Sequence, residues 1–176
     1  MTVTRQAGTR RPARRLALLL GLVALGALVP PPTATGTTGT AGTAVPLVKG
    51  ENFVTARTSG ILHIEAGECF TDPAYSEEAA EVVVLYTPCH ERAANQSYGF
   101  VHAPEGAWDP AALSAFAWRS CGRGFDSHWG GGTASELRFY PVLPTRETWA
   151  GGDRDVMCVV YSPGGPMDGS ALPLAR

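Results

Sequence analysis

The sequence is poor in charge and in lysine, and its apolar runs are short. Charged residues make up 17% of the 176 positions, and Lys49 is the single lysine beside thirteen arginines. Five of these arginines precede residue 16, which leaves residues 49–176 with nine basic and sixteen acidic residues, a net charge of −7. Because binding to nucleic-acid phosphates needs a basic face, this balance excludes a DNA- or RNA-binding domain.

The longest apolar run covers residues 16–29, behind the five arginines and ahead of three prolines. A bilayer span takes about 20 apolar residues, so this run of 14 is short for an anchor and typical of a signal-peptide core. Its basic flank sends the downstream chain across the membrane. Residues 1–29 are therefore predicted to be a signal peptide or membrane anchor, with cleavage left open. Residues 30–50, rich in Pro, Thr, Ala and Gly, are predicted to be a flexible spacer.

The remaining chain, residues 52–172, is predicted to be one α+β domain. The whole chain contains 21 glycines and 14 prolines. This content favours turns and short strands over a helical bundle. Strands are expected where β-branched or alternating residues gather, at 61–64, 81–87, 97–102, 136–142 and 155–161. With one helix among them, this order predicts a small antiparallel sheet with the helix packed on one side.

The helix is expected to begin at the N-cap Asp109 with Pro110 in its first position, and to end at two glycines, Gly122 and Gly124. Its apolar positions form one inward stripe that ends at Cys121. Among the strands, 81–87 is expected to be well buried. Strand 97–102 is expected to place Tyr98, Phe100 and His102 on one face.

The four cysteines, Cys69, Cys89, Cys121 and Cys158, all lie in the exported part. An even number outside the cytoplasm favours two disulfides, for which three pairings are open. We favour Cys121 with Cys158, because one ends the inward stripe of the helix and the other lies on a strand face. Cys69 would then pair with Cys89 across a hairpin-like connection. The crossed pairings stay open because the strand order is unknown.

Three stretches of the domain carry a family pattern. Gly67-Glu68-Cys69-Phe70 opens it, Pro88-Cys89 follows the valine-rich strand, and residues 144–158 read PTRETWAGGDRDVMC. This pattern resembles that of the septum formation domain family of high-GC Gram-positive bacteria, over roughly residues 60–172. The resemblance implies an extracytoplasmic domain at the cell envelope or division septum, and no known reaction. The matching positions outside the cysteines are Gly67, Phe70, Pro88, Pro144, Trp149, Gly152, Asp153 and Arg154.

The chain departs from this pattern after Cys89. The family carries a His and a Glu where this sequence has Ala93 and Gln96. Any activity that rests on those two side chains is therefore absent here. Within the matching block, Trp149 is expected in the core and Gly152 in a turn. Arg154 is expected to pair with a carboxylate, for which Glu68 is a candidate.

We expect a non-catalytic binding or scaffolding domain, with no cofactor and no metal. Its partner would be an envelope protein or a cell-wall glycan, with membrane contact through the N-terminal segment if that segment is not cleaved. Trp108 and Trp129 lie beside loops and are candidates for partner contact, although we favour a role in covering the ends of the core.

The alternative is an envelope hydrolase that uses carboxylates or His102. The carboxylates Glu77, Glu78 and Glu81 gather beside one predicted strand, but a glycosidase pair must flank a cleft. A zinc site built from Cys89, His90, Cys121 and His128 lacks the close spacing of structural zinc ligands. A Cys–His nucleophile would need a free thiol, which two disulfides would remove.

Overall fold

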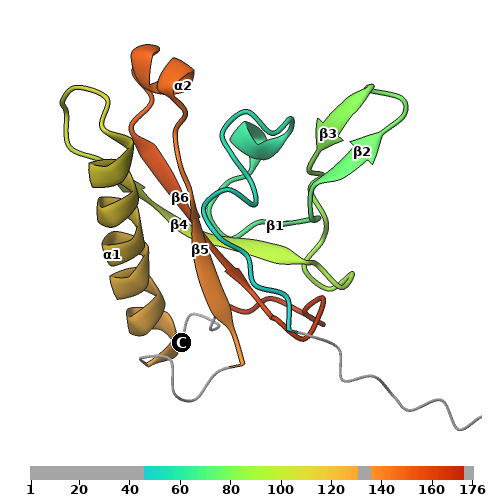
Figure 1. Ribbon diagram of the computed structural model, residues 1–176. Coiled ribbons are helices and arrows are strands. Elements are labelled where there is room, and N and C mark those ends of the chain that lie inside the picture. The colour runs from blue at the N-terminus through green and yellow to red at the C-terminus, as the bar shows by residue number, and fades with distance from the viewer. Residues whose placement is uncertain (1–45, 131–135, 173–176) are drawn as a thin grey trace, which may run out of the picture. The chain divides into compact units, whose positions relative to one another are not determined.

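The computed structural model describes residues 46–130 and 136–172 (Figure 1). The apolar run 16–29 and the spacer up to residue 45 lie outside the described residues. Within the described ranges, no helix is both long enough and apolar enough to cross a membrane.

The predicted α+β class is confirmed. Four antiparallel strands form the main sheet in the order β1 (Cys69–Phe70), β4 (Asn95–His102), β6 (Asp155–Tyr161) and β5 (Arg138–Val142). The long helix α1 (Pro110–Trp129) packs against β4, β5 and β6 (Figure 1). A separate hairpin joins β2 (Ala74–Ser76) to β3 (Glu81–Val83), and the short helix α2 (Arg146–Ala150) connects β5 to β6.

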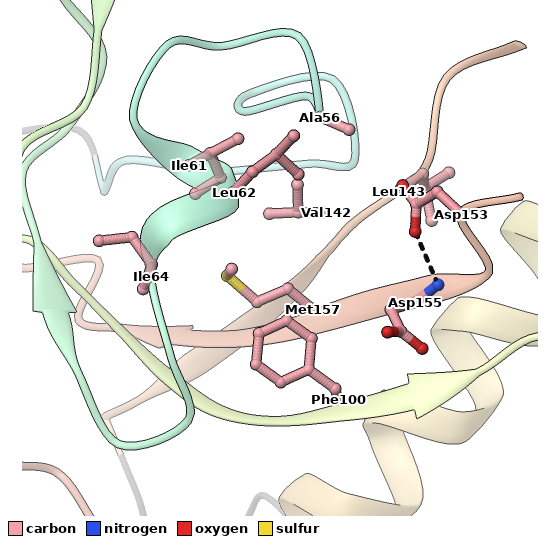
Figure 2. Close-up of a pocket in the computed structure, with 10 residues that line it drawn as sticks. All are labelled: Ala56, Ile61, Leu62, Ile64, Phe100, Val142, Leu143, Asp153, Asp155 and Met157. Carbon is pink, nitrogen blue, oxygen red and sulfur yellow. Dashed lines mark hydrogen bonds between the residues drawn. The ribbon is translucent and has the colours of Figure 1, made fainter. Parts of the chain in front are cut away.

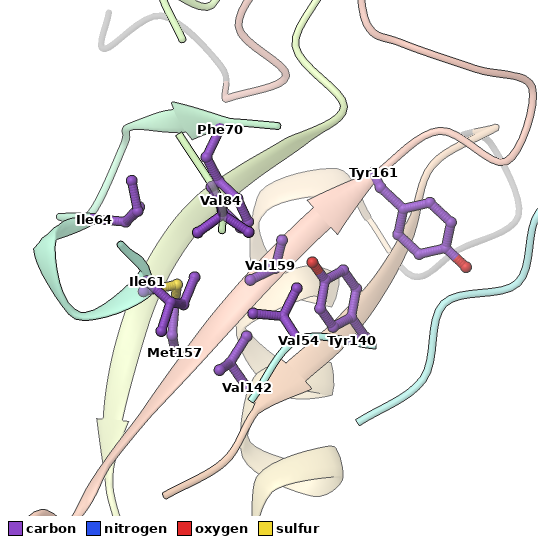
Figure 3. Close-up of a cluster of buried hydrophobic side chains, with 10 residues drawn as sticks. All are labelled: Val54, Ile61, Ile64, Phe70, Val84, Tyr140, Val142, Met157, Val159 and Tyr161. Atoms are coloured by element: carbon purple, nitrogen blue, oxygen red, sulfur yellow. The ribbon is translucent and has the colours of Figure 1, made fainter. Parts of the chain in front are cut away.

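The side chains of strand β6 alternate between the two faces of the sheet and so contribute to two separate apolar clusters. Val156, Cys158 and Val160 face α1, as predicted, and belong to one apolar cluster with the helix stripe. Met157 and Val159 point to the opposite face, into a second cluster. There the sheet is covered by residues 53–64, for which the sequence pattern had not predicted this role. Figure 3 shows the second cluster, made of Val54, Ile61, Ile64, Phe70, Val84, Tyr140, Val142, Met157, Val159 and Tyr161.

Helix α1 begins as predicted and ends later than predicted. The Asp109 carboxylate accepts hydrogen bonds from the first free backbone N–H groups, at 3.1 and 3.0 Å. The helix then continues through both glycines to Trp129 and closes at Gly130. A Cβ on Gly122 would lie 3.3 Å from the Phe139 ring, and one on Gly124 would lie 3.2 Å from the Tyr98 ring. These glycines therefore allow the helix to pack closely on the sheet, which outweighs their poor helix propensity of about 1 kcal/mol each.

The predicted shared face of strand 97–102 is wrong because the strand contains a β-bulge. The pairing of β4 with β6 shifts between Ser97 and Gly99, so Tyr98 is an extra residue. Tyr98 turns toward α1, where its hydroxyl donates a 2.8 Å hydrogen bond to a helix carbonyl. Phe100 and His102 lie on the face opposite α1.

Two other expected strands differ from the prediction. Residues 61–64 contain the 3-10 helix η1 (Ile61–His63) in place of a strand. It follows Gly60, whose φ of 88° turns the chain and whose missing Cβ makes room for the Val84 carbonyl. Residues 81–87 form only the short strand β3, which is largely exposed because it pairs with β2 and not with the main sheet. Val84, the next residue, is buried in the second cluster.

Both favoured disulfides are present. Cys69 bonds Cys89 across 5.2 Å between Cα atoms, and Cys121 bonds Cys158 across 5.3 Å. The second bridge joins α1 to β6, as the helix stripe predicted. Two disulfides indicate an oxidising, extracytoplasmic setting.

Candidate functional site

The block 144–158 forms a tightly packed corner. Trp149 is 8% exposed, as predicted, and its indole N–H donates to the Gly106 carbonyl at 3.2 Å. Pro144 is buried, and Gly152 has a φ of 97° in the turn after α2. The Asp153 carboxylate accepts a 3.0 Å hydrogen bond from the backbone N–H of Asp155. The Trp149 and Asp153 side chains therefore contribute to the packing of this corner.

Arg154 pairs with a different carboxylate from the one predicted. Its guanidinium donates to Glu105 at 3.1 Å and to the Trp149 carbonyl at 2.8 Å. Glu68 instead accepts from the backbone N–H of Glu65. Glu68 precedes β1, which pairs with the first residues of β4, whereas Arg154 lies beside the last residues of β4. The two side chains are thus at opposite ends of the same strand.

Gln96, at the position where the family pattern has Glu, is a buried hydrogen-bonding centre. It is 1% exposed, and its amide N–H₂ donates to the Gly67 carbonyl at 2.9 Å and to the Ser170 hydroxyl at 2.8 Å. Its carbonyl accepts from the Ala171 N–H at 2.7 Å. Ala93, the other departing position, is also buried, and its carbonyl accepts from the Met167 N–H. Both positions anchor the C-terminal segment.

Gly67, Phe70 and Pro88 have local structural roles. Gly67 has a φ of 90° in the turn before β1, and Phe70 is fully buried. The Pro88 carbonyl accepts the Glu91 N–H in the turn beside Cys89.

Trp108 and Trp129 are both half-buried against the cluster on the helix side, as the favoured interpretation expected. The ring of Trp108 meets Trp149 edge-on at 5.7 Å. Trp129 packs on Phe125, and its N–H donates to the Ala171 carbonyl at 3.0 Å. Contact of either ring with a partner stays a prediction.

The groups considered for hydrolysis are dispersed. Glu77, Glu78 and Glu81 lie exposed on the β2–β3 hairpin. All four cysteines are bridged, so the Cys–His alternative has no free thiol. In residues 46–130 and 136–172, His, Cys, Asp and Glu side chains form no group of three that could hold a metal ion. His102 does pair with Asp155 at 2.9 Å, with both side chains exposed.

A shallow pocket opens beside this pair, on the sheet face opposite α1 (Figure 2). We call it the Phe100 pocket, and its volume is about 170 Å³. Its floor is apolar and buried, whereas Leu62 and Phe100 on its rim are 67% and 44% exposed. Asp153 and Asp155 add negative charge at one end. The lining residues are Ala56, Ile61, Leu62, Ile64, Phe100, Val142, Leu143, Asp153, Asp155 and Met157.

The pocket was not predicted from the sequence. Leu62 lay in a predicted strand and Phe100 was expected on the same face as Tyr98. The β-bulge places Phe100 beside Met157, and η1 turns Leu62 outward. Neither the β-bulge nor the 3-10 helix η1 can be recognised from the periodicity of the sequence.

A comparison of the chain with protein families, curated proteins and solved structures finds no match.

Proposed function

We propose that the chain is a non-catalytic, extracytoplasmic binding domain of the cell envelope that acts near the division septum. The disulfides support the extracytoplasmic setting, and the motif resemblance supports the septum. Export would use residues 1–29, which leave the domain either secreted or anchored to the membrane by its N-terminus.

The Phe100 pocket carries the binding proposal. Large apolar side chains exposed around a hollow are a common mark of protein interaction sites. The side chains of Leu62 and Phe100 are exposed at the rim, while the apolar residues of the pocket floor are buried. A partner side chain that enters the pocket would be desolvated at the centre of the contact, where binding energy concentrates.

The occupant we propose is an extended segment of an envelope protein with an apolar side chain next to a basic one. The apolar group would fill the pocket and the basic group would meet Asp153 or Asp155. The net charge of −7 over residues 49–176 favours the approach of such a cationic segment. A glycan fits less well, because the pocket floor offers apolar side chains and few groups for sugar hydroxyls.

The test is site-specific photo-cross-linking in native cells with the full chain. A cross-linker at Leu62 should capture an envelope protein, while the same group at Ser127, exposed on α1, should not. Phe100→Ala should reduce capture at Leu62, because loss of a contacting side chain costs on the order of 1–2 kcal/mol. Equal capture at both sites, or capture of glycan alone, would contradict the proposal.

The His102–Asp155 pair favours an envelope hydrolase as the second candidate function. Asp155 would orient the imidazole and His102 would act as general base on a bound water. Under this alternative His102→Ala would abolish hydrolysis of a cell-wall substrate. Under the binding proposal, capture at Leu62 would persist in this variant.

A further inference from the structure

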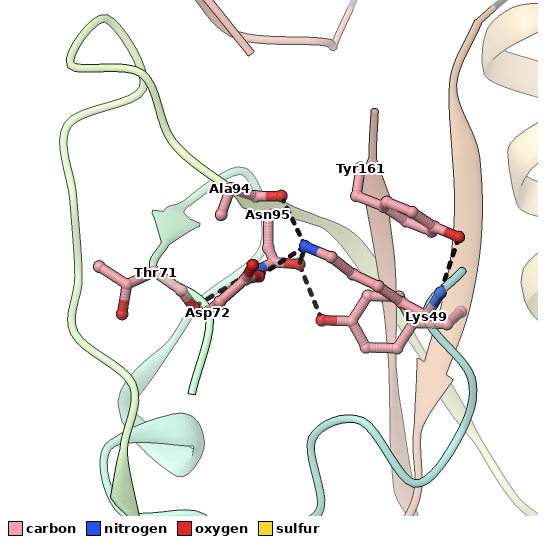
Figure 4. A network of polar contacts seen from close by, with 7 residues as sticks. Lys49, Thr71, Asp72, Ala94, Asn95 and Tyr161 are labelled. Atoms are coloured by element: carbon pink, nitrogen blue, oxygen red, sulfur yellow. Dashed lines mark hydrogen bonds and ion pairs between the residues drawn. The ribbon is translucent and has the colours of Figure 1, made fainter. Parts of the chain in front are cut away.

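The single lysine of the chain, Lys49, lies inside the domain and not in the predicted spacer 30–50. Lys49 is 4% exposed. Its ammonium nitrogen Nζ donates to Asp72 Oδ1 at 2.5 Å, to Asn95 Oδ1 at 3.0 Å and to the Ala94 carbonyl at 3.2 Å (Figure 4). The rings of Phe53 and Tyr161 flank it, with centroids at 4.9 and 5.0 Å.

The side-chain amide of Asn95 is held at both ends. Its carbonyl oxygen Oδ1 accepts from Lys49 and also from the Tyr140 hydroxyl, each at 3.0 Å. Its nitrogen Nδ2 donates to Asp72 Oδ1 at 2.9 Å and to the Thr71 carbonyl at 3.1 Å. Asn95 and Tyr140 are both fully buried.

One carboxylate oxygen therefore contacts two nitrogens. Asp72 Oδ1 lies beside the amine of Lys49 and beside the amide nitrogen of Asn95. This is the position from which a carboxyl group can take a proton from one nitrogen and give it to the other. The Tyr140 O–H lies where it would stabilise negative charge on the amide oxygen.

The surroundings make the Lys49 ammonium easier to deprotonate than an exposed lysine. Burial lowers the pKa of Lys49, and this effect outweighs the opposing hydrogen bond and charge of Asp72. A desolvated lysine that transfers its proton to an adjacent carboxylate becomes a nucleophile. The fixed contacts hold the amine beside the amide. The reaction therefore avoids the entropy cost of bringing the two groups together from solution.

We propose that Lys49 and Asn95 join in an intramolecular isopeptide bond, with Asp72 as the proton-transfer group. The Lys49 ammonium first gives a proton to the Asp72 carboxylate. Nζ then attacks Cγ of Asn95, while Tyr140 stabilises the oxygen of the tetrahedral intermediate.

Protons pass through Asp72 to Nδ2, and the bond between Cγ and Nδ2 breaks. An ammonium group and a primary amide thus become a secondary amide and an ammonium ion, so atoms and charge balance without an oxidant. A small cavity of about 50 Å³ beside Lys49 and Asp72 gives the departing ammonia a route outward. The Asp72 side chain, which is 40% exposed, lies on that route.

The bond would tie the start of the folded domain to β4, a central strand of the sheet. Tension on the chain ahead of residue 46 would then reach the sheet through a covalent bond. This inference does not depend on the proposed binding partner.

Peptide mapping of the oxidised full chain tests the bond. After reduction, alkylation and digestion with trypsin, an isopeptide at Lys49 would block cleavage there. We expect a branched species in which a peptide ending at Arg57 is joined to peptide 93–119, lighter than the two by one ammonia. Release of the free peptide 50–57 in full yield would overturn the proposal. A link to peptide 58–92 with loss of water would also overturn it, because Asp72 would then be the acyl group.

Matched variants test the roles. Asp72→Asn should slow bond formation by about 10²–10⁴-fold, as expected for loss of a general acid–base group. Tyr140→Phe should also slow it, whereas Tyr161→Phe should not, because the Tyr161 hydroxyl contacts the Lys49 backbone N–H and not the reacting atoms. The disulfide-linked peptides in a parallel digest without reduction report whether each variant has folded. A folded Asp72→Asn protein in which the bond forms at the wild-type rate would refute the role of Asp72. The peptide map of the wild-type protein tests whether the bond between Lys49 and Asn95 exists.

Discussion

The guanidinium of Arg154 lies over the indole ring of Trp149, with its central carbon 3.9 Å from the ring centroid. The same guanidinium donates to the Trp149 carbonyl at 2.8 Å. One arginine thus covers the ring and satisfies the backbone at the end of α2. A lysine in its place would lose the flat stacking and the forked hydrogen bonding. The motif Trp-x-x-Gly-Asp-Arg is therefore explained by packing within this corner.

Trp149→Ala should lower the free energy of unfolding by about 3–5 kcal/mol, because a large buried ring is removed. Trp129→Ala should cost clearly less, since that ring is only half-buried. Urea denaturation of both variants measures the difference. Small and equal losses would show that Trp149 is not a core residue.

Removal of either disulfide by paired Cys→Ala substitutions should destabilise the domain by about 3–4 kcal/mol, because the unfolded chain gains freedom. The bridge from Cys121 to Cys158 closes the longer loop, with a separation of 37 residues against 20 for Cys69 to Cys89. Its removal should cost slightly more. Denaturation measures the cost, and non-reducing peptide mapping checks the pairing. A link from Cys69 to Cys121 or Cys158 would contradict the structure.

Gln96→Glu should destabilise the domain by about 2–3 kcal/mol at neutral pH, because a carboxylate cannot donate to the Gly67 carbonyl and is costly to bury. Burial should raise the pKa of the new carboxyl above its value in the unfolded chain. The folded state then keeps a proton that the unfolded state releases, so stability falls as pH rises above about 4.3. Denaturation at several pH values tests this. Ser170→Ala removes the hydroxyl that accepts from Gln96 and from the Leu172 N–H, and it buries no charge, so it should cost only about 1 kcal/mol.

Alkaline pH should unfold the domain through its buried tyrosines. Burial raises the pKa of Tyr98, with a smaller contribution from Asp126, and burial also raises the pKa of Tyr140. Above about pH 10 the unfolded state loses these protons while the folded state keeps them, so stability falls as pH rises. Denaturation across this range should show the decline, and Tyr98→Phe should make it shallower. An unchanged slope in that variant would contradict the assignment.

Alkaline phosphatase fused after Lys49 should be active in cells, because residues 16–29 and their arginine flank should export the fused enzyme. Deletion of residues 16–29 from the same fusion is the control and should abolish the activity. An inactive fusion with the intact segment would contradict export. N-terminal sequencing of the native protein then separates a cleaved signal from an anchor.

Local chemistry in the sequence determined the start of α1, the strand 155–161 and the α+β class. Asp109 and Pro110 act on the first turn of the helix alone, so their effect can be seen without knowledge of the rest of the fold. The favoured disulfide between Cys121 and Cys158 followed from two periodic elements that each show an apolar face. The choice among pairings nevertheless needed the strand order.

Only the tertiary structure decided the end of α1, the exposure of strand β3 and the face of Phe100. Glycine by itself favours the end of a helix, but Gly122 and Gly124 lie within α1 because they fit against aromatic rings from the sheet. A β-bulge changes the face of every residue beyond it, and composition does not reveal where one occurs.

The same limit applies to the polar groups. Which carboxylate Arg154 meets, and whether Lys49 lies in a spacer or inside the domain, depends on contacts between segments distant in sequence. Lys49 reaches Asp72 and Asn95 across 23 and 46 residues. A charged side chain is buried only where the completed fold supplies its partners, so its role is decided by packing and not by its neighbours in the chain.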